Sequence, residues 1–182
     1  MKPLLTLILA LGLISQGLAA DAPQAPAFQL ADSNGEMISL PRTDKKQGAD
    51  IYLFWATWCP YCKALMPHLQ SIIDEYGEDQ ITVYALNIRE DGDPQGYLES
   101  QGFDFILLPE ADAVATEYRA KTTPGVLLVD RAGKIQFNLY QLVANDSASL
   151  ADLSHRQKAA RRAPWWAAEL RQAIDRVLAS DR

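Results

Sequence analysis

The stretch Trp55-Ala56-Thr57-Trp58-Cys59-Pro60-Tyr61-Cys62-Lys63 decides the fold of this chain. It follows the β-rich run 51–54 and leads into a helical pattern that ends near residue 76, so it marks a strand-to-helix junction. The first cysteine then lies at a helix N-terminus, where unpaired N–H groups and the helix dipole stabilise a thiolate. We therefore expect Cys59 to be an exposed nucleophile for thiol–disulfide exchange and Cys62, one turn deeper, to be the resolving thiol.

The cysteine pair also has two simpler interpretations. An exported protein often uses such a pair as a structural disulfide, but closing so short a loop removes little entropy from the unfolded chain. A zinc site needs two further ligands, and the only histidines, His68 and His155, stand at no zinc-binding spacing. The pattern favours a redox-active pair and predicts no bound metal.

Composition narrows the function classes. The chain has 182 residues, 48% of them hydrophobic, and a net charge of −6. This predicts one domain over residues 21–182 with a sizeable core, and no binding of nucleic acid. No phosphate-binding glycine loop is present, and the redox motif requires no cofactor.

Residues 1–20 have the pattern of a signal peptide: Lys2, a short apolar run over 4–18, then Ala19-Ala20. The run is shorter than the roughly 20 residues of a comfortable membrane span, so a cleaved signal is favoured over an uncleaved anchor. Export implies an oxidising compartment, and we expect the periplasm.

Apolar patterns predict the remaining elements. A hairpin over 28–30 and 37–40 precedes a buried strand over 51–56. Further strands are expected at 81–88, 103–108, 126–130 and 134–140, and helices at 60–76, 94–101 and 111–118. Residues 141–163 are predicted to form an extra basic helical segment whose cluster 155–162 is a solvated face or a docking site. Pro164 is expected to open a separate terminal helix.

Two motifs resemble the thioredoxin superfamily. Phe54 to Cys62, with Pro67 in the following helix, resembles the active site of the TlpA/ResA/DsbE type, and Thr122-Thr123-Pro124-Gly125-Val126-Leu127-Leu128-Val129-Asp130 resembles its second motif. The resemblance covers about residues 25–140. It implies an α/β, thioredoxin-like fold: a central mixed β-sheet flanked by helices, with an N-terminal β-hairpin and a TlpA-type helix-strand insertion.

The resemblance also implies which residues contact a substrate. The proline aligned with Pro124 is cis in this family and faces the cysteines, so Thr123 and Pro124 are expected to present backbone groups to an incoming substrate strand. Trp58, together with Pro60 and Tyr61 between the cysteines, is expected to complete the contact surface.

The chain departs from the family in its acidic groups. Resolving a mixed disulfide requires a proton acceptor for the second thiol. Leu53 and Leu65 occupy the positions where thioredoxins and ResA-like proteins carry an acid. Glu90, at the end of a neighbouring strand, remains as the candidate proton acceptor, against the alternative of a solvated loop carboxylate.

The resemblance implies disulfide exchange on cysteine-containing exported proteins. We expect a reductase, kept reduced by a membrane electron donor of the DsbD type, with apocytochrome c or a copper-site protein as substrate. The Pro-Tyr dipeptide between the cysteines keeps an oxidase or isomerase as the alternative. A peroxidase is disfavoured because Ala56 replaces the threonine that peroxiredoxins need. A non-catalytic assembly factor that binds metal through the cysteines remains as an alternative that is not an enzyme.

Overall fold

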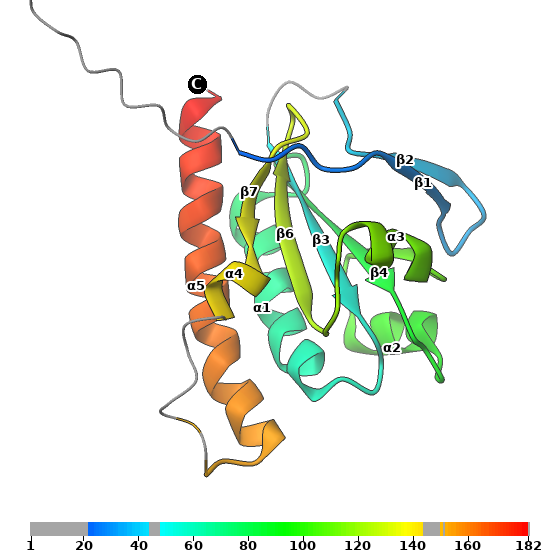
Figure 1. Cartoon of the computed structure of the whole chain (residues 1–182), viewed down its shortest axis with the longest axis vertical. Helices are drawn as coiled ribbons and strands as arrows, with labels where there is room; N and C mark the ends of the chain where they lie inside the picture. The colour runs from blue at the N-terminus through cyan, green and yellow to red at the C-terminus, as the bar shows by residue number, and fades with distance from the viewer. Residues whose placement is uncertain (1–21, 44–47, 144–149, 151, 182) are drawn as a thin grey trace, which may run out of the picture.

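The computed structural model describes residues 22–43, 48–143, 150 and 152–181. Within these ranges lies a five-stranded mixed sheet of order β5–β4–β3–β6–β7. Its strands are β3 (Ala49–Trp55), β4 (Ile81–Asn87), β5 (Ile106–Leu108), β6 (Gly125–Asp130) and β7 (Ile135–Asn138). The strands β3, β4 and β5 run parallel to one another, whereas β6 is antiparallel to both β3 and β7 (Figure 1).

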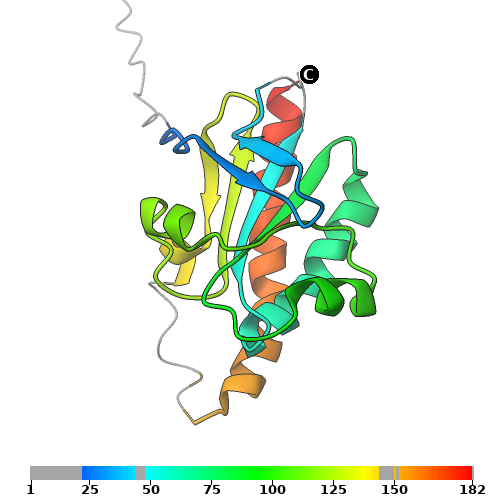
Figure 2. The same ribbon diagram turned by 90° about the vertical axis from the view of Figure 1, so that its right-hand side faces the viewer.

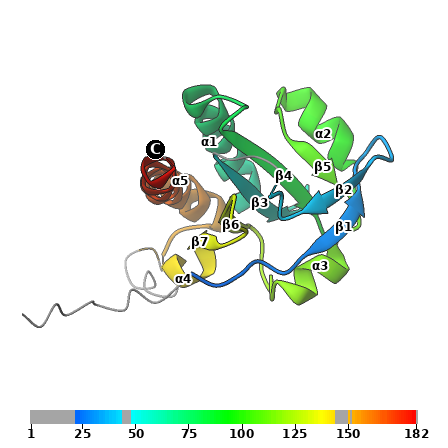
Figure 3. The ribbon, with the colours of Figure 1, turned by 90° about the horizontal axis from the view of Figure 1, so that it is seen from above.

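The central strand β3 is buried along its whole length, as its continuous apolar sequence predicts. Successive side chains point to opposite faces of the sheet. Ile51 and Leu53 enter one core with helices α1 (Pro60–Tyr76), α2 (Pro94–Gln101) and α5 (His155–Ser180). Tyr52 and Phe54 enter a second core with α3 (Asp112–Glu117). Figure 3 shows these two helical layers on either side of the sheet.

A separate hairpin covers the second core. Strands β1 (Phe28–Ala31) and β2 (Met37–Leu40) pair antiparallel, as the sequence predicts. Phe28 contacts Tyr52 and Tyr118 edge to face, with ring centroids 6.0 and 5.8 Å apart. Figure 2 shows the hairpin crossing the face of the sheet that α1 and α5 leave open.

The C-terminal region differs from the prediction. Pro164 does not open a new helix, because α5 already begins at His155 and continues through the proline. Ser154 caps α5: its hydroxyl accepts from the N–H of Gln157, whose side chain in turn accepts from the Ser154 N–H. The basic cluster 155–162 is therefore the start of the terminal helix. Pro164 costs this helix one hydrogen bond, which the packing of α5 against the core offsets.

Two strands are shorter than predicted. β5 begins at Ile106, and the preceding Phe103 and Phe105 stack on each other with centroids 5.0 Å apart. β7 ends at Asn138, whose side chain accepts the N–H of Tyr140 and starts the short helix α4 (Leu139–Val143).

The predicted signal segment 1–20 lies outside the described residues, as do parts of 141–163. In the portion of the chain that is described, no helix is both long and apolar enough to cross a lipid bilayer.

Candidate redox site

The junction between β3 and α1 positions both thiols. Cys59 is the N-cap residue of α1, with extended backbone angles (φ −80°, ψ 111°), and Pro60 takes the first helical position. The Cys59 sulfur accepts a hydrogen bond from the N–H of Cys62, at 3.3 Å. The sulfur thus stands where a side-chain oxygen usually caps a helix.

Cys59 is less accessible than the sequence predicts. It is only 2% exposed, and Cys62 is fully buried. The expectation of an exposed Cys59 is therefore wrong. The reason is the capping geometry, which turns the sulfur back over the first turn of α1.

The two thiols differ in acidity. The pKa of the Cys59 thiol falls from 9.0 to about 6, first because the Cys62 thiol donates a hydrogen bond to it. The Thr123 hydroxyl and the N–H groups of Cys62 and Tyr61 also bind the Cys59 sulfur, and together these donors outweigh the opposing effect of burial. Burial, followed by the hydrogen bond to Cys59 and the charge on that sulfur, raises the pKa of Cys62 well above 9.0.

The loop before β6 faces the same sulfurs. Thr123 and Pro124 are joined by a cis peptide bond. The Thr123 side chain hydrogen-bonds with both Cys59 and Cys62, so this loop lies against the redox pair. The sequence argument foresaw the position of the loop but assigned Thr123 a role through its backbone only.

Tyr140 supports this loop, and sequence reasoning missed it. Its hydroxyl donates to the carbonyl of Thr122 at 2.7 Å. The ring occupies the space beside Gly125 that a side chain would fill, since a Cβ there would collide with the Tyr140 hydroxyl. The only trace of this contact in the sequence is that Gly125 is small and Tyr140, 15 residues later, is aromatic. Nothing in the sequence shows that these two residues meet.

The predicted contact residues surround the redox pair. Trp58 is 48% exposed, and its indole N–H donates to the Arg89 carbonyl at 2.8 Å. Pro60 is exposed and Tyr61 is half-buried. The Tyr61 hydroxyl lies 3.2 Å from Nδ1 of His155, and its ring packs against Trp166. The first turns of α5 therefore form a wall beside the Pro-Tyr dipeptide.

Glu90 lies beside the loop that precedes Cys59. Its carboxylate accepts hydrogen bonds from the N–H and hydroxyl of Thr57, from the Asn87 side chain at 2.6 Å, and from the N–H groups of Asp91 and Gly92. Burial alone would raise the pKa of Glu90, but the bonds from Thr57 and Asn87 outweigh it and lower the pKa from 4.5 to about 2. Such a carboxylate binds protons weakly, so these contacts favour anchoring the loop over accepting a proton.

Among the residues that the structure describes, no three His, Cys, Asp or Glu side chains gather closely enough to hold an ion.

Comparison with known proteins identifies the family. The sequence model of the AhpC/TSA family matches residues 22–138. The chain belongs to this family. It is 31% identical over 123 residues to the thiol-disulfide oxidoreductase ResA of Halalkalibacterium halodurans, covering 66% of this chain and 68% of that one. It is also 31% identical over 147 residues to the sporulation thiol-disulfide oxidoreductase A of Bacillus subtilis, covering 74% and 87%.

Solved structures agree on the fold. The thioredoxin domain of a thiol-disulfide oxidoreductase from Bacteroides vulgatus superposes with a TM-score of 0.56 at 24% identity, covering 69% of this chain and 96% of that domain. The thioredoxin-like fold and the TlpA/ResA/DsbE-like resemblance are confirmed, and this AhpC/TSA member is a thiol:disulfide oxidoreductase.

Proposed function

We propose that this oxidoreductase is an exported disulfide reductase that works through Cys59 and Cys62. The observation that carries the proposal is the unequal acidity of the two thiols. A nucleophile must be a thiolate, and a resolving thiol must stay protonated until the mixed disulfide has formed. Cys59, with a pKa of about 6, suits the first role at neutral pH, and Cys62 suits the second.

The exchange then proceeds in two balanced steps. The Cys59 thiolate attacks one sulfur of a substrate disulfide, forms a mixed disulfide and releases the other substrate sulfur as a thiolate. Cys62 then loses its proton to solvent or to the released thiolate, and attacks the Cys59 sulfur. The second substrate sulfur leaves, two electrons have passed to the substrate, and the protein holds a Cys59–Cys62 disulfide.

The only moderate acidity of the Cys59 thiol favours the reducing direction. A more acidic nucleophile stabilises the reduced form and makes the protein a stronger oxidant. Thioredoxin, a reductant, has a nucleophile of pKa about 7, whereas the oxidant DsbA has one of about 3.5. The pKa of about 6 at Cys59 lies closer to the first value.

The surrounding residues supply contacts for the substrate chain. We assign Trp58, Pro60 and Tyr61 on one side, and Thr123 with Pro124 on the other, to the binding of an extended substrate segment. Glu90 acts as a positioning residue, because its hydrogen bonds tie the end of β4 to Thr57, two residues before Cys59.

The predicted signal peptide and the family resemblance support a proposal for the location and the partners. The pattern of residues 1–20 supports export to the periplasm. There the protein would receive electrons from a membrane donor of the DsbD type and reduce cysteine pairs in exported proteins. Apocytochrome c and copper-site proteins are the substrate classes that the resemblance implies.

The test is the reduction potential of the Cys59–Cys62 pair, measured by equilibration with a glutathione buffer. A value near that of thioredoxin, about −270 mV, supports a reductase, and one near that of DsbA, about −120 mV, makes the protein an oxidase. A Cys62→Ser variant provides a second test: if the protein is an exchange enzyme, this variant accumulates as mixed disulfides with its substrates. A protein that neither cycles nor traps substrates is no exchange enzyme.

A further inference from the structure

A basic pocket lies next to the redox site. It has a volume of about 340 Å³. Its floor is apolar and buried, built from Ile88 just after β4 and from Ala115 and Ala120 in and after α3. Its rim carries the exposed cations Arg89, Arg119 and Lys121.

The charge of this pocket is opposite to that of the chain. Three cations and the single carboxylate of Asp112 line it, which leaves a local charge of +2 in a protein of net charge −6. The Asp112 carboxylate accepts the backbone N–H of Arg89, at 3.2 Å. Within the described part of the chain, the side chains of Arg119 and Lys121 form no ion pair with any acid. The cations therefore face outward and remain available to an external anion.

The backbone holds two of these cations in an uncommon conformation. Arg89 has φ 49° and Arg119 has φ 55°, in the left-handed region that residues with a Cβ seldom adopt. Both positive-φ arginines line the same pocket. Residues in such conformations concentrate at ligand-binding sites, where the surrounding contacts maintain them.

Two hydrogen bonds of Arg89 connect the pocket to the redox site. The Arg89 carbonyl accepts the indole N–H of Trp58, the residue before Cys59. The Arg89 guanidinium donates to the carbonyl of Lys121 at 3.2 Å, and Lys121 leads directly into Thr122-Thr123-Pro124. A substrate segment that lies across Trp58 and Thr123 therefore passes the mouth of the pocket.

We propose that this pocket binds a carboxylate carried by the substrate polypeptide close to its reactive cysteine. The inference rests on the proposed exchange function and adds a preference to it. An acidic side chain places its charge among Arg89, Arg119 and Lys121, and its methylenes over the apolar floor. Opposite charges that meet at a partly apolar surface attract more strongly than in bulk water. The protein accordingly prefers acidic disulfide substrates although its own net charge is negative.

The test uses two peptide disulfides, one with glutamates beside its cysteine and one with glutamines. For the wild-type protein we expect kcat/KM to be about 1.5- to fivefold higher for the glutamate peptide, the range that exposed ion pairs provide. In an Arg119→Gln/Lys121→Gln double variant this ratio falls close to one. Raising the ionic strength to roughly 0.5 M lowers the wild-type ratio, since salt screens exposed charges.

An Arg176→Gln variant is the matched control, because Arg176 is an exposed arginine on the last turns of α5. It should keep the wild-type ratio. Equal rates for the two peptides in the wild-type protein overturn the inference. So does a loss of preference in Arg176→Gln that reaches half of that in the double variant, which removes twice the charge, because such a loss would reflect net charge alone.

An uncharged disulfide, bis(2-hydroxyethyl) disulfide, separates the two levels of the proposal. If the wild-type protein reduces it but shows no peptide preference, only the carboxylate site is wrong. If the wild-type protein reduces no disulfide at all, the proposed function fails and the inference fails with it.

Discussion

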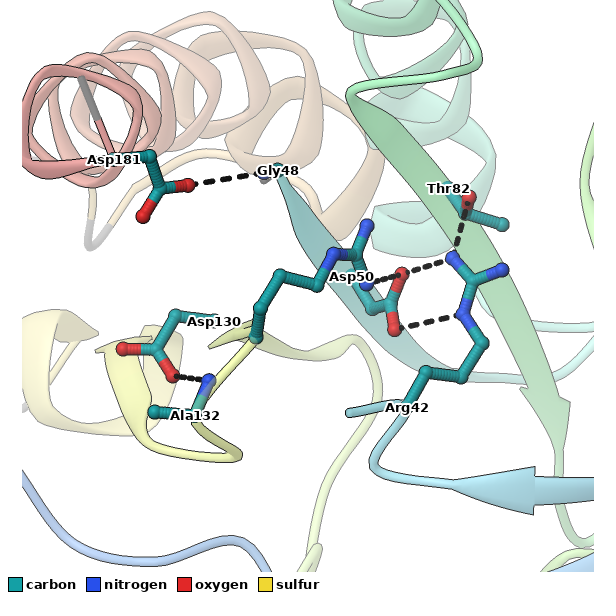
Figure 4. Close-up of polar contacts among 8 residues, drawn as sticks. Arg42, Gly48, Asp50, Thr82, Asp130, Ala132 and Asp181 are labelled. Atoms are coloured by element: carbon teal, nitrogen blue, oxygen red, sulfur yellow. Dashed lines mark hydrogen bonds and ion pairs between the residues drawn. The ribbon is translucent and has the colours of Figure 1, made fainter. Parts of the chain in front are cut away.

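The two ends of β3 stabilise buried polar groups in different ways. At its start, Asp50 is 1% exposed, accepts a hydrogen bond from Arg42 at 2.6 Å and forms an ion pair with Arg131 at 2.8 Å. Figure 4 shows Arg42 bridging from Asp50 to Thr82 on the neighbouring strand, and Asp181, the residue after α5, reaching Gly48. Beyond the other end of β3, two buried thiols share hydrogen bonds with each other and with a loop.

The difference teaches what each end can do. At the start of β3, one carboxylate lies between two guanidinium groups, and removing that carboxylate breaks both ion pairs. At the redox end, the charge forms on one sulfur and is held by N–H and O–H donors, which leaves the thiolate free to form a covalent bond. We expect the first end to govern stability and the second to govern reactivity.

The largest effect on activity is expected from Cys59→Ser. This variant should lose disulfide exchange down to the uncatalysed background, because no thiolate remains to attack the substrate. Its free energy of unfolding should change by less than about 1 kcal/mol, as serine also caps a helix. Activity on a dithiol–disulfide pair and urea unfolding measure both quantities, and a Cys59→Ser variant that still turns over would break the comparison at the redox end.

The largest effect on stability is expected from Asp50→Asn. It removes the carboxylate that forms ion pairs with Arg42 and with Arg131, which is 8% exposed, and should lower the free energy of unfolding by about 3 to 5 kcal/mol. Urea unfolding measures this, with the exposed Asp152→Asn as the matched control. The pKa of Cys59 should stay at about 6 in the folded variant. A small loss of stability would contradict the role of Asp50 in stability, and a shifted pKa of Cys59 would show that the two ends of β3 are not independent.

Glu90→Gln sharpens the comparison within the redox end. Losing the charged acceptor should cost about 1 to 3 kcal/mol and slow exchange by a few-fold, while the midpoint of the pH–rate profile stays unchanged. A shifted midpoint would instead indicate that Glu90 accepts the proton from Cys62.

The stability of the same variant should also depend less on pH. The folded pKa of Glu90, about 2, lies below its ordinary value of 4.5. Its contribution is therefore complete above pH 4.5 and lost as the pH falls through about 2. Unfolding measured across this window should show a flatter profile for Glu90→Gln than for the wild type or for the exposed control Glu36→Gln.

The smallest effect is expected from Tyr61→Phe. It removes the hydroxyl that lies 3.2 Å from His155 but keeps the ring that packs on Trp166. One half-exposed hydrogen bond contributes about 0.5 to 1.5 kcal/mol at most, so unfolding and exchange rates should change little. A loss of activity comparable to that of Glu90→Gln would assign the His155 contact a larger part in the site.

Local patterns predicted the redox end better than the opposite end. The geometry of the Cys-Pro-Tyr-Cys stretch can be predicted locally, because the strand, the N-cap residue and the proline at the first helical position are neighbours in sequence. Arg131 is far from Arg42 and Asp50 in the chain, and the sequence analysis placed none of the three in a buried cluster. No local pattern reports that two arginines from different loops converge on one aspartate.

Two predictions, the exposure of Cys59 and the helix start at Pro164, were wrong for the same reason. Cys59 was expected to be exposed, but the turn of its sulfur over α1 depends on its rotamer and on Thr123, a residue from a distant loop. Pro164 was expected to start a helix, but the packing of residues such as Trp166 and Leu170 carries α5 through it. Both outcomes follow from tertiary contacts that override a local rule.

The most direct test of this account is the thiolate titration of the reduced protein, followed by ultraviolet absorbance in the wild type and in Cys59→Ser. We predict one thiolate with a midpoint near pH 6 in the wild type, and no such transition in Cys59→Ser. A midpoint near 9, or a transition near 6 that survives in Cys59→Ser, would contradict the assignment of Cys59 as the activated nucleophile.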